Sequence, residues 1–248
     1  MSTVWYDAEF IGQKVEVAGT NRFWFKLKSD SPVAYKPGQF FVFDLPSGEK
    51  RADRWRSYSI ANIYDGSNIL ELCITYEKGG VASQYLFNDI NKGDVVKCKG
   101  PEGNFILPED TSKSLVFIAT GAGLVPFRAM IQQIEQEKLK YKSVHLIFGA
   151  RKEKTILFYE ELEDWSHFID HFTTSICLSK ETKLPKPKNN MDFFEGHVHQ
   201  VYLNKKYPDK KNVVFMICGW SGMIDEAVAH LINTLKIDRT QIKYELFG

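Results

Sequence analysis

The sequence is poor in cysteine and has no long hydrophobic run. Its four cysteines, at positions 73, 98, 177 and 218 of 248, form neither a CxxC pair nor the spacing of an iron–sulfur site. We therefore expect no metal site and no disulfide framework, and a reducing, cytoplasmic compartment follows as the default. No uncharged stretch approaches the ~20 residues of a membrane-spanning helix. The first ten residues carry Asp7 and Glu9 in place of the apolar run of a signal peptide.

An excess of either charge is also lacking. Lys and Arg number 32 and Asp and Glu number 31, which gives a formal net charge of +1. No overall field therefore draws nucleic acid or an anionic membrane to the protein. Pairs such as Lys205-Lys206 are interpreted as solvated surface charges. We expect no nucleic-acid partner and no insertion into a membrane.

The first part of the chain, from residue 10 to about 106, has short runs rich in β-branched and aromatic residues. These runs are residues 23–27, 39–43, 70–75 and 95–98. Turn residues such as Pro37-Gly38 and Asp65-Gly66 separate them. Several short strands with only one brief helical candidate predict an antiparallel β-barrel.

After Pro108 apolar runs alternate with segments of helical spacing. The runs are residues 115–119, 144–148, 173–178 and 213–217, and the helical segments are 127–137, 158–165 and 223–235. Unbroken apolar runs are typical of parallel strands that are covered on both faces. The alternation predicts a doubly wound α/β parallel sheet. We expect two domains, residues 1–110 and 111–248, with residues 183–190 as a basic surface loop.

The first motif is Arg56-Ser57-Tyr58-Ser59-Ile60. An arginine guanidinium offers a bidentate fork to phosphate oxygens. Tyr58 offers an aromatic face to a flat heterocycle, and Ser59 a hydroxyl near the reactive edge of that ring. Taken alone, the motif is also that of an ordinary edge strand with an exposed arginine.

The second motif is Gly79-Gly80-Val81-Ala82-Ser83. Two glycines allow the backbone to approach a ligand closely, and Ser83 can cap a short helix. Free amides at a helix N-terminus form an anion site. The alternative is a plain glycine turn, but with Arg56 upstream the motif predicts a second set of donors for one diphosphate.

The third motif runs from Thr120 through Gly121, Gly123 and Pro126 to Arg128. It follows the apolar run 115–119 and begins a helix, so we expect it at the carboxyl edge of the sheet, where dinucleotides bind. Pro126 suits a first helical turn. The motif is not the GxGxxG fingerprint, and a tight structural turn remains the alternative.

Two further motifs lie near the end of the chain. Cys218-Gly219-Trp220-Ser221-Gly222-Met223 follows the run 213–217. A buried thiol is usually inert, but this position at a strand end favours a sulfur that faces a ligand. Residues 243–248 alternate like a strand and end almost on an aromatic residue, which is unusual for a terminus and suggests docking.

These five motifs, in this order, resemble those of the ferredoxin–NADP reductase superfamily over nearly the whole chain. The segments around Cys218 and Glu245-Leu246-Phe247 are most similar to the plant-type enzymes. The resemblance implies FAD bound by the barrel and a nicotinamide dinucleotide bound by the α/β domain. It also implies hydride transfer between nicotinamide C4 and flavin N5, after which the flavin releases single electrons.

The resemblance further implies a role for each motif residue. Tyr58 lies against one flavin face, Ser59 bonds near N5, and Cys218 lies beside nicotinamide C4. Glu245 orients Ser59 or relays a proton, and Phe247 stacks on the other flavin face and moves aside for nicotinamide. The other implied FAD contacts are Arg56, Ile60, Gly80, Val81, Ala82 and Ser83, and the other implied nicotinamide-dinucleotide contacts are Thr120, Gly121, Gly123, Pro126, Gly219 and Met223. Phe247 replaces the tyrosine of the plant enzymes, and Gly248 follows it.

Coenzyme choice depends on the 2′-phosphate that distinguishes NADP from NAD, which calls for cationic donors. Ser179-Lys180-Glu181-Thr182 resembles the family's Ser-Arg-Glu-Thr phosphate motif, with lysine in place of arginine. Lysine keeps the charge and loses the bidentate fork. His197 stands where related enzymes often carry a second arginine. A solvated loop charge is the alternative for Lys180, and we expect NADP(H) over NAD(H).

The electron partner is open to several hypotheses. Because the 248 residues carry no cysteine cluster, we expect any iron–sulfur carrier to be a separate protein. The first hypothesis is exchange with ferredoxin or flavodoxin. A second is an NAD(P)H reductase that serves an oxygenase, or that reduces free flavin, quinone or dyes. A third is a flavin-binding redox sensor without turnover, but Ser59, Cys218 and Glu245 argue against it because binding alone does not require them.

Overall fold

The computed structural model describes residues 4–247, so Gly248 lies outside the described residues. Within them the chain forms two compact units. The first comprises the residues up to 107 together with residues 125–133, and the second comprises residues 108–124 and the residues from 134 onward. No helix within residues 4–247 is long and apolar enough to span a membrane.

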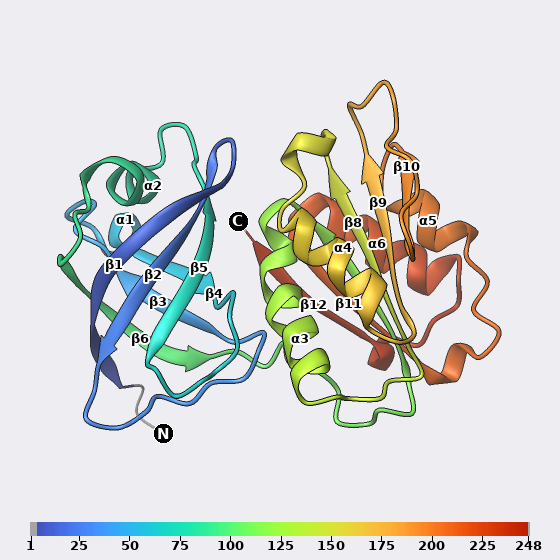
Figure 1. The fold of residues 1–248 in the computed structure, drawn as a ribbon, viewed down its shortest axis with the longest axis horizontal. Helices are drawn as coiled ribbons and strands as arrows, with labels where there is room; N and C mark the ends of the chain where they lie inside the picture. Colours follow the sequence, from blue (N-terminus) through green and yellow to red (C-terminus); the bar gives the residue numbers. More distant parts are fainter. Residues whose placement is uncertain (1–3, 248) are drawn as a thin grey trace. The chain divides into compact units, whose positions relative to one another are not determined.

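The first unit is built on a six-stranded antiparallel sheet in the order β4-β3-β6-β1-β2-β5 (Figure 1). Its strands are β1 (Trp5–Val17), β2 (Thr20–Lys28), β3 (Phe40–Asp44), β4 (Trp55–Ser59), β5 (Ile69–Thr75) and β6 (Val95–Glu102). The strands at the two ends of this order, β4 and β5, also contact each other, which closes the sheet into a barrel. The predicted antiparallel barrel is confirmed.

Alternating side chains explain why these segments form strands. In β2, Phe23, Phe25 and Leu27 are buried, while the residues between them are more exposed. Phe41 and Phe43 of β3 are fully buried in the same core. Because successive side chains of a strand point to opposite faces, one largely aromatic face fills the inside of the barrel.

Two one-turn helices accompany the barrel strands. Helix α1 (Arg51–Arg54) precedes β4, and α2 (Val81–Gln84) continues into the turn η1 (Tyr85–Asp89). The two helices contact each other, which brings the start of β4 close to the second motif. The sequence predicted only one brief helix in this region. Helix α1 escaped prediction because it buries no side chain, so its residues show no apolar periodicity.

The second unit is a six-stranded parallel sheet in the order β10-β9-β8-β7-β11-β12. Its strands are β7 (Ser114–Thr120), β8 (Ser143–Ala150), β9 (Phe172–Leu178), β10 (Met191–Glu195), β11 (Val213–Trp220) and β12 (Ile242–Phe247). The four apolar runs predicted after Pro108 all lie within strands. Strand β10 at one edge was not predicted, since it has only five residues and no unbroken apolar run like those of β7, β8, β9 and β11.

Helices cover both faces of this sheet. They are α4 (Tyr159–Phe168), α5 (His199–Asn204) and α6 (Ser221–Asn233). Helix α3 (Leu124–Gln136), most of which belongs to the first unit, follows the 3-10 turn η2 (Gly121–Gly123). The other 3-10 turns are η3 (Glu153–Thr155), η4 (Lys210–Asn212) and η5 (Arg239–Gln241). Tyr202 of α5 and Ala227 of α6 pack with Ile147 on one face. On the other face, Ser166 of α4 hydrogen-bonds Thr174 at 2.8 Å. The predicted doubly wound sheet is confirmed.

A buried ion-pair network joins residues 125–133 to the barrel strands within the first unit. Arg128 is 4% exposed and Glu71 6% exposed. The Arg128 guanidinium donates to a Glu71 carboxylate oxygen at 3.1 Å, and Arg22 donates to the same oxygen at 2.6 Å. Arg128 also donates to the carbonyl oxygen of Ala61 at 2.5 Å. Because a buried charge is costly unless it is paired, each member of the network depends on the others.

We expect the substitution Glu71→Leu to lower the free energy of unfolding by about 3–5 kcal/mol, because it removes the carboxylate that both Arg22 and Arg128 contact and leaves Arg22 with the more distant Glu16. Replacing all three partners (Arg22→Met, Glu71→Leu, Arg128→Met) should recover part of the loss, since the two arginines no longer carry a charge without the Glu71 carboxylate. Recovery is incomplete because Glu16 loses Arg22, which lies 3.8 Å away. Urea denaturation followed by circular dichroism measures both values.

The exposed ion pair between Lys97 and Asp7 is the control for the buried network. Lys97→Ala should change the free energy of unfolding by less than about 1 kcal/mol. A loss as small as this in Glu71→Leu would mean that the buried network contributes no more than a surface pair.

Candidate functional site

The first motif occupies β4 and pairs with β3. In that register Phe41 lies opposite Tyr58 and Phe43 opposite Arg56, so both motif side chains share the face of the core phenylalanines. The Tyr58 ring packs edge-on against Phe43, with 5.8 Å between ring centroids. Burial raises the pKa of the Tyr58 hydroxyl above its usual range, so the phenol stays neutral.

The remaining residues of this motif have defined partners. Arg56 donates to the carbonyl oxygens of Ala52 and Trp55 at 2.5 and 2.8 Å, which holds its guanidinium beside helix α1. Ser59 is 6% exposed and Ile60 is fully buried. Ser59 therefore lies just inside the surface at the end of β4, on the opposite face of the strand from Tyr58.

The second motif forms the start of α2. Gly80 is the N-cap residue, and Val81 and Ala82 make the first helical turn. The predicted capping role of Ser83 is wrong. Its hydroxyl lies 2.9 Å from the carbonyl oxygen of Glu77 and 3.0 Å from that of Gly80. The physical reason is that a side chain at the third helical position points back over the preceding turn, so Ser83 closes this turn from inside.

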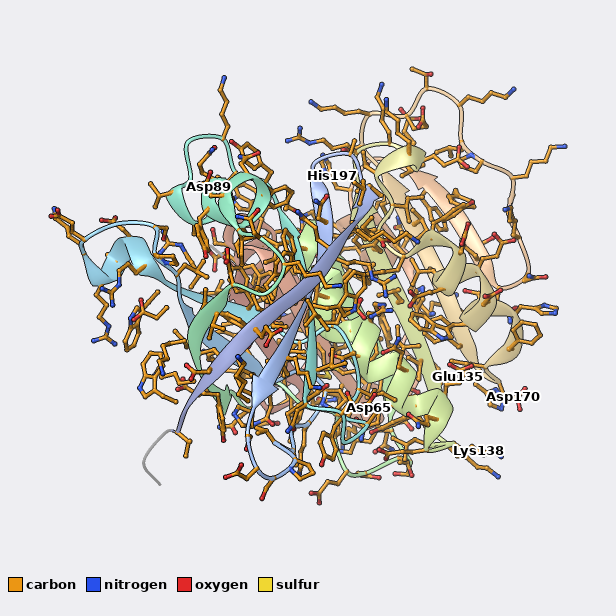
Figure 2. The ribbon with its side chains drawn as sticks, turned by 60° about the vertical axis from the view of Figure 1, so that its left-hand side comes forward. Asp65, Asp89, Glu135, Lys138, Asp170 and His197 are labelled. Atoms are coloured by element: carbon orange, nitrogen blue, oxygen red, sulfur yellow. The ribbon has the colours of Figure 1, made fainter. Side chains whose placement is uncertain are left out.

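A hollow of about 360 Å³ lies against the second motif. It is lined by Pro46, Ser47, Gly79, Gly80, Val81, Gln84, Tyr85 and Asp89. Asp89, at the end of η1, is labelled in Figure 2. This volume falls in the range of small-molecule sites. Because α1 contacts α2, the hollow and the Arg56 end of β4 belong to the same part of the first unit.

The third and fourth motifs meet at the carboxyl edge of the parallel sheet. A side chain on Gly123 would overlap the carbonyl oxygen of Cys218, and one on Gly219 would overlap Thr120. The backbone amide of Trp220 points at the Thr120 hydroxyl, 3.5 Å away. Two turns that are about a hundred residues apart in the sequence are thus in direct contact, and glycine at both positions is what permits it.

The predicted catalytic residues of the second unit lie on adjacent strands. Cys218 of β11 pairs with Glu245 of β12, and Trp220 pairs with Phe247. Cys218 is fully buried. Burial, with the Glu245 charge as a second cause, raises the pKa of its thiol well above the usual value. The sulfur is therefore an uncharged thiol. Ser59 belongs to the first unit, so its relation to Glu245 stays a prediction.

The residues predicted for the 2′-phosphate lie at the ends of β8, β9 and β10. The Lys180 amide donates to the carbonyl oxygen of Arg151 at 2.8 Å, and the Gly196 amide to that of Leu178 at 3.0 Å. Lys180, the neighbouring Ser179 and His197 therefore share one edge. Figure 2 shows His197 at one end of this unit and Asp170, which precedes β9, at the other.

Arg151 is a further cation at this edge, and the sequence reasoning did not consider it. It is exposed and follows β8 directly, so it sits beside Lys180. The signal was present in the sequence as a basic residue just after the apolar run 144–148. Arginine offers the bidentate fork that Lys180 lacks. Within residues 4–247, no group of three or more His, Cys, Asp or Glu side chains could hold a metal ion.

Two family models match this chain, each over a different part of it. The family model of the oxidoreductase FAD-binding domain matches residues 8–106, and that of the oxidoreductase NAD-binding domain matches residues 117–229. These matches define an FAD- and NAD-binding oxidoreductase. The chain is 32% identical over 229 residues to ferredoxin–NADP reductase B of Sorangium cellulosum (strain So ce56), covering 90% of this chain and 89% of that protein. It therefore belongs to the ferredoxin–NADP reductase superfamily.

Other relatives are longer than this chain. The reductase component of propane 2-monooxygenase from Rhodococcus jostii (strain RHA1) is 28% identical over 224 residues, which are 90% of this chain and 58% of that protein. The chain thus spans somewhat more than half the length of that relative. The crystal structure of the Amycolatopsis cytochrome P450 reductase GcoB has a TM-score of 0.83 at 24% identity. The matched region is 99% of this chain and 70% of that chain, and the two chains share the same fold.

We expect Gly123→Ala to weaken NADP⁺ binding at least tenfold, because the added carbon overlaps the Cys218 carbonyl and pushes the two turns apart. Crowding of this kind should also cost about 1–3 kcal/mol of stability. Calorimetric titration with NADP⁺ and urea denaturation measure the two effects. Gly66→Ala is the control for affinity, since the added carbon meets open space there and any backbone strain from the positive φ of Gly66 affects stability alone. Unchanged affinity in Gly123→Ala would show that the contact between the turns does not shape a dinucleotide site.

Proposed function

We propose that this chain transfers a hydride from NAD(P)H to FAD and passes the electrons singly to a separate carrier, ferredoxin or flavodoxin. Residues 1–110 form the FAD-binding domain and residues 111–248 the NAD(P)-binding domain. The observation that carries the proposal is the cluster at one edge of the parallel sheet. There the Gly123 turn contacts Cys218, and Cys218 pairs with Glu245.

The first unit has groups that fit FAD. The hollow beside Gly80 and the amides at the start of α2 suit a diphosphate, and Arg56 adds a positive charge. Tyr58 offers the face of a neutral phenol to the flavin ring. Ser59 presents its hydroxyl at the end of β4, and Ser83 acts indirectly by fixing the turn before α2. FAD bound there supplies the hydride acceptor and the step from paired to single electrons.

In this proposal the dinucleotide lies across the carboxyl edge of the second sheet. Strands β8 and β7 separate β9 from β11, and strands are about 4.8 Å apart, so the ends of β9 and β11 are roughly 14 Å apart. Lys180 and Arg151 bind the 2′-phosphate at one end of that span, with Ser179 and His197 beside them. The turn 120–123 binds the pyrophosphate, and Cys218 packs beside the nicotinamide.

Cys218 gives the nicotinamide a buried and uncharged neighbour. The protonated Cys218 thiol offers a small neutral contact instead of a nucleophile that could add to the ring. Glu245 beside it carries the carboxylate through which a proton can be relayed. The protein thus contributes position and environment, while the cofactors contribute the redox chemistry.

An alternative partner is the oxygenase of a multicomponent system. A specific observation favours it, since one relative is the reductase component of propane 2-monooxygenase. In both cases the one-electron centre is carried outside these 248 residues, because all four cysteines are free and buried at separate positions. Free cysteines also support the proposed cytoplasmic location.

The direct test of the function is the visible spectrum of the purified protein. We expect a yellow protein whose flavin absorption is bleached anaerobically by stoichiometric NADPH. A protein that stays colourless with added FAD contradicts the proposal, and one whose flavin remains oxidised supports the redox-sensor alternative. Reduction of ferredoxin that weakens as salt rises supports a docked acidic partner. Reduction of quinones or dyes alone, with no dependence on salt, contradicts a docked acidic partner.

We expect Lys180→Ala and Arg151→Ala each to raise the Michaelis constant for NADPH by about tenfold, because each removes a charge-assisted hydrogen bond to the 2′-phosphate. The constant for NADH should hardly change, since NADH has no such phosphate. Steady-state kinetics with both coenzymes measures the difference. Lys186→Ala, in the exposed loop after β9, is the matched control. Equal effects on both coenzymes would remove these residues from the 2′-phosphate site.

A further inference from the structure

The side chain of Trp220 is unusually exposed for a tryptophan. It is the last residue of β11, and 70% of its surface is open. Burying a large aromatic side chain is favourable, so an exposed one leaves that free energy unused. Single exposed apolar residues are common on protein surfaces, and exposure alone is therefore no argument for a role. The surroundings of the ring are what point to a ligand.

The ring of Trp220 is held in place at the edge of the sheet. Trp220 is the N-cap residue of α6, and its amide points at Thr120 of the first turn. The six-membered part of the indole lies over Gly222, where a side-chain carbon would come 2.7 Å from it. A glycine at this position thus lets the indole lie close against the start of the helix.

The place of Trp220 along the edge selects the half of the dinucleotide it can reach. Cys218 lies two residues earlier on β11, and Phe247 is the register partner of Trp220. Lys180 lies at the end of β9, beyond β7 and β8. Trp220 is therefore at the nicotinamide end of the proposed site, away from the phosphate-binding cations.

We infer that the indole of Trp220 packs on the nicotinamide half of the bound dinucleotide and holds it at the end of β11. The inference rests on the proposed function, because it requires a dinucleotide at this edge. Stacking suits a flat ring on an aromatic platform, and it explains why the site keeps an exposed indole over a glycine. Trp220 is thus a substrate-positioning residue in addition to Cys218.

The test is calorimetric titration of the FAD-loaded protein with two ligands. We expect Trp220→Ala to raise the dissociation constant for NADP⁺ about tenfold, as loss of base stacking on an aromatic ring does. The constant for 2′,5′-ADP, which lacks the nicotinamide, should stay unchanged. Trp220→Phe should retain most of the NADP⁺ affinity. The same comparison is made with NAD⁺ and ADP, a ligand pair in which neither member has the 2′-phosphate.

A second variant displaces the indole ring of Trp220 without removing it. Gly222→Ala places a methyl group against the indole and displaces it, while alanine favours helix α6 over glycine. We expect weaker NADP⁺ binding with no loss of stability. Phe168→Ala, at the end of α4 and 69% exposed, is the matched control and should leave both constants unchanged.

Fluorescence gives a readout that a purely structural role would not move. NADP⁺ should protect the wild-type protein from iodide quenching, 2′,5′-ADP should not, and Trp220→Phe should abolish the protection. If NADP⁺ and NAD⁺ bind neither wild type nor variants, the proposed function itself fails. If they bind with the same affinity to wild type and Trp220→Ala, and Trp220 stays open to iodide, the proposed function survives and this inference is overturned.

Discussion

The proposed dinucleotide site depends on one close approach, between the turn after β7 and the end of β11. Gly123 lies against the carbonyl of Cys218, and Gly219 lies against Thr120. All strands of a parallel sheet present their carboxyl ends at one edge, and ligands bind where these ends form a crevice. Contact between the two central turns fixes where their backbone amides point. The pairing of β11 with β12 then places Glu245 beside Cys218.

Charge is distributed unevenly along this edge, and the distribution agrees with the chemistry of a dinucleotide. The ends of β8 and β9 carry Arg151 and Lys180, which suit phosphate. The end of β11 carries a neutral buried thiol and an exposed indole, which suit a flat ring. An ionised cysteine would add a negative charge to this end of the proposed site, and burial prevents this. The same hydrophobic packing that forms the sheet therefore also sets the protonation state of Cys218.

The sequence was sufficient for the architecture, and its failures have physical causes. Apolar runs revealed β7, β8, β9 and β11 because strands covered on both faces are almost continuously apolar. Helix α1 buries no side chain, so no periodicity marked it. Ser83 was assigned as a cap because its residue type favours that role, but the helix begins three residues earlier at Gly80. Arg151 was missed because a single basic residue after a strand gains meaning only when its neighbour on the next strand is known.

The choice of electron partner has a different physical basis from the hydride step. The match to a ferredoxin–NADP reductase and the match to an oxygenase reductase component both extend over 90% of this chain. What these proteins share is therefore carried by the two units, whereas partner choice must reside in features that vary among them. Docking of redox proteins is governed by surface charge and is sensitive to salt, while the two turns of the proposed dinucleotide site meet through glycines beside a buried cysteine. Because the net charge is only +1, such a docking surface has to come from local clusters of charged residues. The partner can thus change through surface substitutions that leave the Gly123–Cys218 contact intact.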